Sequence, residues 1–162
     1  MLLNGEIAKN EFHMPWLITP SYILDRPKDI GVRKYDISLT GDLRSEKIGS
    51  LDLERVLEDF DAKCNFVLGY RESPPNLVDR EISTESREDL SQLLLSSKYV
   101  LILASPKYFY RHAGTIWEAI MHGCGVIVPN YPVILSQASN ATNYHVYNDL
   151  DSHSIDNLIL KL

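Results

Sequence analysis

Short apolar runs alternate with longer segments of helical periodicity from residue 35 to the end of the chain. Four of these runs are five or six residues long and rich in β-branched and aromatic side chains, which is typical of strands buried on both faces of a sheet. They span 35–40, 65–70, 99–104 and 125–129, and a shorter run at 144–147 is a fifth predicted strand.

The segments between the runs carry their apolar side chains on one side of a helix. A helix over 51–63 has such an apolar stripe and a charged opposite face. A second helix is predicted to begin at Ser86, because Ser86 and Asp89 have the spacing of a capping box. Two more helices are predicted over 115–122 and 155–162.

This alternation of strands and helices predicts an α/β fold. Because strand–helix–strand units cross over with one hand, the expected architecture is a single Rossmann-like, doubly wound, mostly parallel sheet of about five or six strands, with helices on both faces. The predicted domain spans 35–162. Residues 1–34 contain three prolines and are predicted to be an extended lead-in or connector segment.

Parallel strands end at one edge of such a sheet, so the loops that follow them are expected to meet there. Open α/β sheets bind their ligands at this carboxyl edge. Four loops are predicted to gather at it, namely 41–45, 70–76, 105–114 and 130–137. Residues 77–85 are charged and have no periodic pattern, so no helix or strand is predicted for them.

Composition and charge exclude several classes of partner. A chain of 162 residues with 44% hydrophobic content is typical of one globular domain. Its net charge of −6 argues against a broad electrostatic grip on nucleic acid or on an anionic membrane. No stretch approaches the ~20 apolar residues of a transmembrane segment. The first residues do not have the pattern of a secretory signal, so a cytoplasmic location is predicted.

The two cysteines, Cys64 and Cys124, do not form a metal-ligand pattern. Neither belongs to a CxxC pair or to a cluster of cysteine and histidine. We therefore predict two reduced thiols in the core and no metal site.

The second half of the chain resembles the nucleotide-sugar-binding domain of GT-B glycosyltransferases, and most closely their exostosin-like branch. The resemblance is carried, in order, by Ser97–Lys98, an apolar strand, a polar loop, Glu118–Ala119–Ile120, the pair Gly123–Cys124 and a run that ends at Val128. Residues 33–38, followed by Gly41 and Arg44, are similar to the opening strand and basic turn of the same domain. The resemblance covers residues 33 to about 135.

The resemblance implies the donor-binding domain of a metal-independent glycosyltransferase of the hexosyltransferase type. Such an enzyme transfers a sugar from a nucleoside-diphosphate sugar to a saccharide or another hydroxyl acceptor. Apart from the nucleotide-sugar donor, no cofactor is implied. A second, acceptor-binding domain is implied as well, supplied by a longer form of the chain or by another chain. Without that domain the protein would bind the donor and not catalyse transfer.

The resemblance also assigns roles to individual residues. It implies that Glu118 accepts hydrogen bonds from the ribose hydroxyls of the nucleotide sugar. Gly114 and Thr115, at the start of the same helix, would lie against the diphosphate, and Arg44 would help to neutralise it. Elementary electrostatics agrees, because the N–H groups at a helix N-terminus favour an anion.

The loop before this helix adds two further candidates for nucleotide-sugar binding. Arg111 is a second cation close to the helix start, and Tyr110 stands where many GT-B enzymes have another glutamate. A leaving diphosphate gains negative charge as the glycosidic bond breaks, so fixed donors and cations around it stabilise the transition state more than the ground state. No residue is assigned as catalytic.

Other interpretations remain open at this point. A non-enzymatic, flavodoxin-like binding or interaction module would use the same fold, and a nucleoside- or NAD-processing hydrolase would use Glu118 as its catalytic group. The alternative interpretation of Glu118 is a solvated helix residue or a partner of the helix dipole, and that of the arginines is an exposed surface position. His112 and His122 are interpreted as structural, because the sequence shows no partner for them at a recognisable spacing.

Overall fold

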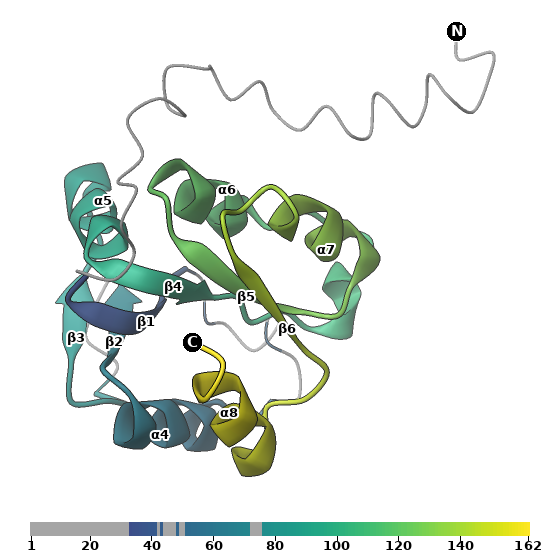
Figure 1. Ribbon diagram of the computed structural model, residues 1–162. Helices are drawn as coiled ribbons and strands as arrows, with labels where there is room; N and C mark the ends of the chain where they lie inside the picture. Colours follow the sequence, from purple (N-terminus) through teal and green to yellow (C-terminus); the bar gives the residue numbers. More distant parts are fainter. Residues whose placement is uncertain (1–32, 42, 44–47, 49–50, 72–75) are drawn as a thin grey trace, which may run out of the picture.

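The computed structural model describes residues 33–41, 43, 48, 51–71 and 76–162. They form a six-stranded sheet of parallel strands in the order β3-β2-β1-β4-β5-β6, covered by helices on both faces (Figure 1). The predicted Rossmann-like, doubly wound architecture is therefore confirmed. The strands are β1 (Tyr35–Leu39), β2 (Phe66–Tyr70), β3 (Glu81–Ser83), β4 (Ser97–Leu101), β5 (Gly125–Pro129) and β6 (Tyr144–Tyr147).

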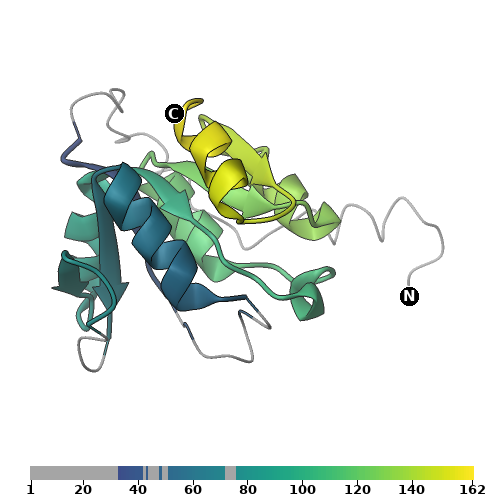
Figure 2. The ribbon, with the colours of Figure 1, turned by 90° about the horizontal axis from the view of Figure 1, so that it is seen from below.

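The helices form two layers. One face of the sheet is covered by α4 (Leu53–Lys63) and α8 (Ser152–Ile159), which lie close together in both ribbon views (Figures 1 and 2). The other face carries α5 (Arg87–Leu95), α6 (Gly114–Met121) and α7 (Pro132–Ala138). A short 3-10 helix, η1 (Pro106–Tyr108), lies between β4 and α6.

An apolar core fills the space on each side of the sheet. Successive residues of a strand point to opposite faces, so Leu101 of β4 packs beneath α4 and α8, and Val100 packs beneath α6 and α7. Both side chains are fully buried. This double burial explains why the central strands are continuous apolar runs in the sequence.

Local signals at the helix ends agree with the sequence in most cases. Ser86 and Asp89 form the predicted capping box at the start of α5, with each side chain bonded to the backbone of the other. Asp52 and Asp151 cap α4 and α8 in the same general way, each accepting a hydrogen bond from a backbone N–H. The start of α6 differs, because Ala113 stands at its N-cap and offers no side-chain acceptor.

Three predictions about elements were wrong. Residues 81–83, expected to be without structure, form β3, whose three residues pair with β2 but are too few to show a period-2 pattern. Residues 130–137 are not a loop, because α7 begins at Pro132, a residue favoured in the first turn of a helix. The strand predicted over 99–104 is β4, which begins earlier, at Ser97, and ends at Leu101, where its neighbour β1 also ends.

Arg33 closes the amino edge of the sheet. Its guanidinium is buried and donates hydrogen bonds to the carbonyl oxygens of Leu94 (3.1 Å), Ser97 (2.7 Å) and His122 (2.8 Å), and to Cys124 Sγ (3.2 Å). It thereby joins the ends of α5 and α6 to the start of β4. The lead-in predicted over 1–34 lies, up to residue 32, outside the described residues.

Candidate functional site

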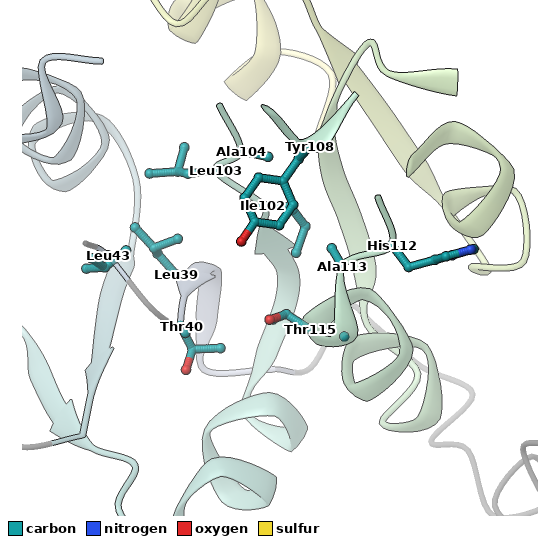
Figure 3. A pocket seen from close by; sticks show the side chains of 12 residues that line it. Leu39, Thr40, Leu43, Ile102, Leu103, Ala104, Tyr108, His112, Ala113 and Thr115 are labelled. Carbon is teal, nitrogen blue, oxygen red and sulfur yellow. The ribbon is translucent and has the colours of Figure 1, made fainter. Parts of the chain in front are cut away.

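A pocket of about 220 Å³ opens at the carboxyl edge between β1 and β4 (Figure 3). These strands are neighbours in the sheet, but the chain continues from β1 towards β2 on one side and from β4 towards β5 on the other. The loops diverge at such a switch point, and this is where open α/β sheets bind ligands. The lining comprises Leu39, Thr40, Gly41, Leu43, Ile102, Leu103, Ala104, Tyr108, His112, Ala113, Gly114 and Thr115.

The pocket combines an apolar wall with a few polar groups. The wall comes from the end of β1, from the turn after it and from the segment after β4. In Figure 3 the hydroxyl groups of Tyr108 and Thr115 point into the space between the two strand ends, whereas the ring of His112 points away from it. Such a mixture of apolar surface and a small number of directed polar groups is typical of small-molecule sites.

The N-terminus of α6 borders the pocket with free donors. Among the described residues, no group accepts a hydrogen bond from the N–H of Gly114 or Thr115. A Cβ atom added to Gly114 would meet no described atom within 4 Å, so the backbone there faces open space. Uncapped N–H groups and the positive end of the helix dipole make this position suitable for an anion.

The turn after β1 approaches α6 closely. Gly41 has a φ of +118°, a conformation that other residues rarely adopt. A Cβ atom on Gly41 would lie 3.4 Å from Oγ1 of Thr115. The glycine therefore lets the backbone turn sharply beside the helix start, and this brings the two sides of the pocket together.

Apart from Glu118, the predicted nucleotide-sugar-binding residues fall into three groups in the structure. Gly114 and Thr115 line the pocket. Tyr110 and Arg111 are exposed and do not belong to its lining, and the ring of Tyr110 packs edge-on against Phe109. Arg44 lies outside the described residues.

Glu118 lies beside the pocket and not in its lining. It is one helical turn beyond Gly114, on the same side of α6. Its side chain is 28% exposed and makes a long contact of 3.5 Å with Arg87 of α5, whose side chain is 79% exposed. An ion pair of this length and exposure contributes little, so the carboxylate can exchange this partner for another at low cost.

His122 has a partner that the sequence did not reveal. Its Nε2 lies 2.7 Å from Oγ of Ser91 in α5, and its Nδ1 lies 2.7 Å from the carbonyl oxygen of Glu118. A carbonyl oxygen only accepts, so Nδ1 carries the proton and Nε2 accepts from the serine hydroxyl. The pair joins α5 to α6 and lies outside the pocket lining. Since 31 residues separate the partners, no local spacing could indicate the contact.

The two cysteines are free thiols and not nucleophiles. Burial raises the pKa of Cys64 to about 12 and that of Cys124 to about 11, so both stay protonated at neutral pH. Within the described residues, no group of three or more His, Cys, Asp or Glu side chains is arranged to hold a metal ion. None of the helices in that part of the chain has the length and apolar character that crossing a membrane requires.

Comparison of the chain with protein-family models gave no match, and comparison with curated proteins gave none either. The function is therefore inferred from the geometry of the pocket and from the resemblance of the sequence.

Proposed function

We propose that the chain is the donor-binding domain of a GT-B-type glycosyltransferase and binds a nucleoside-diphosphate sugar in the pocket between β1 and β4. The observation that carries the proposal is the uncapped start of α6, which borders a pocket at the switch point of a parallel sheet. Dinucleotides bind other Rossmann-type sheets at the same place, with their phosphates at a helix N-terminus.

The diphosphate would lie against the first residues of α6. The N–H groups of Gly114 and Thr115 supply donors whose direction is set before the ligand arrives, and the Thr115 hydroxyl adds a third. As the bond to the sugar breaks, the leaving diphosphate gains negative charge, and these donors stabilise that charge without having to reorganise. Arg44, which follows β1 in the sequence, is the cation that we expect to complete this half of the site.

The nucleoside would extend along α6 from the diphosphate. Glu118 is one turn further along the same side of the helix, at a place where its carboxylate can accept hydrogen bonds from ribose hydroxyls. The pocket of about 220 Å³ is smaller than the roughly 300–1,000 Å³ typical of sites that enclose a whole ligand. We therefore assign it the diphosphate and one adjoining group, with the rest of the ligand outside.

Transfer of the sugar requires an acceptor at the open side of this pocket. In GT-B enzymes, which the sequence resembles, a second Rossmann-like domain binds the acceptor and closes the cleft. We assign this chain the donor half of the reaction, with a saccharide or another hydroxyl compound as the acceptor. Tyr110 and Arg111, exposed on the loop before α6, are the residues expected to meet the donor once the cleft is closed.

The substitution Gly114→Ala tests the proposal without disturbing the fold. The added methyl group has room in the protein, but it would occupy the space through which a phosphate reaches the N–H groups. We expect UDP or GDP to bind the wild type in isothermal titration calorimetry and to bind Gly114→Ala at least tenfold more weakly. Glu118→Ala is expected to weaken binding as well. Gln92→Ala, on the exposed side of α5, is the control and should bind like the wild type.

Three results would contradict the proposal. If neither UDP nor GDP binds the wild type, the chain is better described as a non-enzymatic binding module. If NAD is hydrolysed and Glu118→Ala abolishes the hydrolysis, Glu118 is a catalytic residue of a hydrolase. Equal affinity of Gly114→Ala and wild type for the nucleotide would place the diphosphate away from α6.

A further inference from the structure

We propose that Gln137 of α7 is a positioning residue for the pocket, because it fixes the residue before α6 and so directs the N–H groups of Gly114 and Thr115. This inference rests on the proposed function, since it concerns the donors assigned to the diphosphate. It adds a residue that is hydrogen-bonded to Ala113 of the pocket lining and that comes from an element not predicted from the sequence.

Both ends of the Gln137 carboxamide are bonded to one residue. The N–H of Ala113 donates to Oε1 of Gln137 at 2.9 Å, and Nε2 of Gln137 donates to the carbonyl oxygen of Ala113 at 3.3 Å. Gln137 is only 2% exposed. Burying an amide side chain is costly unless its groups are paired, and here the backbone of Ala113 supplies a partner for each end.

This arrangement fixes the helix start and leaves its donors unused. A serine, threonine or aspartate at an N-cap would itself accept a hydrogen bond from the N–H of the second or third residue of the helix. That bond would occupy a donor that the diphosphate needs. Ala113 has no side-chain acceptor and cannot form this bond. Its backbone is held instead by the two hydrogen bonds with the Gln137 carboxamide. The backbone direction is then set by a neighbouring element while the N–H groups of Gly114 and Thr115 remain available.

The segment between β4 and α6 forms one wall of the pocket, and α7 and β6 hold the beginning of this segment. The hydroxyl of Tyr131, at the N-cap of α7, donates to the carbonyl oxygen of Ala104 at 3.2 Å, and the ring of Tyr131 packs against Phe109. The hydroxyl of Tyr147 in β6 donates to the carbonyl oxygen of Ile102 at 2.8 Å. Burial raises the pKa of both phenols, so both remain protonated donors at neutral pH.

These contacts replace hydrogen bonds that the sheet no longer supplies. After Leu101 the chain leaves β4, and the carbonyl oxygens of Ile102 and Ala104 accept from these two hydroxyl groups. Tyr131 and Gln137 stand at the two ends of α7 and hold the two ends of the segment 104–113. The position of this pocket wall therefore depends on α7.

The substitution Gln137→Met tests this role, since methionine has a similar length and volume but forms neither hydrogen bond. The matched control is Asn140→Ala. Asn140 donates to the carbonyl oxygens of Ser136 and Gln137 at the end of α7, so its loss weakens the same helix without affecting the carboxamide that holds Ala113. If Gln137→Met does not fold, Gln137→Asn, one methylene too short to bond both groups of Ala113, serves in its place.

Two measurements are compared between the variants. In ¹H–¹⁵N spectra of the ligand-free protein, we expect the amide signals of Gly114 and Thr115 to shift in Gln137→Met and to stay unchanged in Asn140→Ala. In calorimetric titrations with UDP and GDP, we expect Gln137→Met to bind at least tenfold more weakly than the wild type, and Asn140→Ala to bind like the wild type.

The outcomes separate this inference from the proposed function. Unchanged amide signals in Gln137→Met would overturn the positioning role, whatever the nucleotide does. Shifted signals with unchanged UDP or GDP affinity would overturn it too, because the ligand would then not use these donors. If the signals shift but the wild type binds neither nucleotide, Gln137 is supported as the residue that holds the helix start, and it is the proposed function that fails.

Discussion

The two ends of α6 meet opposite surroundings, and the difference separates the structural edge of the sheet from its candidate functional edge. At the carboxyl end of α6, the carbonyl oxygen of His122 accepts a hydrogen bond from the buried guanidinium of Arg33. At the amino end, Gly114 and Thr115 line a pocket, and their N–H groups have no acceptor among the described residues.

The same physical rule explains both ends. A helix leaves carbonyl groups unpaired at its carboxyl end and N–H groups unpaired at its amino end. In a parallel α/β sheet the helices run opposite to the strands. The unpaired carbonyl groups therefore lie at the amino edge of the sheet, and the unpaired N–H groups lie at its carboxyl edge. Here the guanidinium of Arg33 donates to the carbonyl oxygens of Leu94 and His122 at the ends of α5 and α6, whereas the N–H groups of Gly114 and Thr115 have no acceptor among the described residues. At the amino edge, folding itself supplies a hydrogen-bond donor for the carbonyl groups. At the carboxyl edge, a bound ligand would supply the acceptor for the N–H groups.

Arg33→Met should have the largest effect on the structural edge. It leaves the carbonyl oxygens of Ser97 and His122 without this donor, while that of Leu94 keeps the Cys124 thiol as a donor; each buried unpaired group costs about 1–3 kcal/mol. We expect the free energy of unfolding, measured by urea denaturation, to fall by about 3 kcal/mol or more. Arg87→Met, at an exposed position, is the control and should change it by less than about 0.5 kcal/mol. A loss below about 1 kcal/mol in Arg33→Met would contradict this account of the amino edge.

The two glycines of the pocket should respond differently to alanine. Gly41 has a positive φ that alanine adopts only with strain, so Gly41→Ala should lower the free energy of unfolding by about 1–2 kcal/mol. Gly114 has room for a methyl group, and Gly114→Ala should change it by less than about 0.5 kcal/mol. Thermal or urea denaturation of the two variants side by side tests this. Equal losses would mean that the helix start is packed and not open.

Asp36→Asn should show the smallest effect, and one that depends on pH. Burial acts to raise the pKa of Asp36, but hydrogen bonds from Lys98 and from the N–H of Asn65 outweigh it, so the pKa is lowered. A lowered carboxyl pKa stabilises the fold above the pKa of the unfolded chain, and this contribution is lost as the pH falls through the folded value.

The difference in unfolding free energy between wild type and Asp36→Asn should therefore be largest near neutral pH and shrink below about pH 4. Because the Asp36 and Lys98 side chains are 37% and 30% exposed, we expect at most about 1 kcal/mol. Salt should reduce it further. Urea denaturation between pH 3 and pH 7 measures the trend, and a difference that grows towards low pH would contradict the assignment.

How well the sequence predicted an element depended on how local its signal was. β5 was predicted with the bounds Gly125–Pro129 because a continuous apolar run needs no information from elsewhere. The start of α5 was predicted because Ser86 and Asp89 bond within one turn. β3 has only three residues and α7 only seven, so neither shows enough periods to be recognised.

The residues of the candidate site also differ in how far the sequence alone could predict them. Gly114 and Thr115 could be predicted from the sequence because they begin an amphipathic helix that follows a strand. Gln137 could not, since 24 residues separate it from Ala113, and only the packing of α7 against α6 brings them together. The same holds for Ser91 and His122. The position of Glu118 beside the pocket depends on the direction of α6 relative to β1, which no local sequence pattern contains.

By itself, the sequence determined the α/β class, the order of most strands and helices, and the place along the chain where α6 begins, because each of these depends on the periodicity of nearby side chains. The tertiary structure alone decided that β1 and β4 lie side by side and leave a pocket where they diverge. It also decided that Arg33 closes one edge while α7 holds the wall of the other. These contacts join residues far apart in the chain, and they form only when strand order and helix packing bring them within hydrogen-bonding distance.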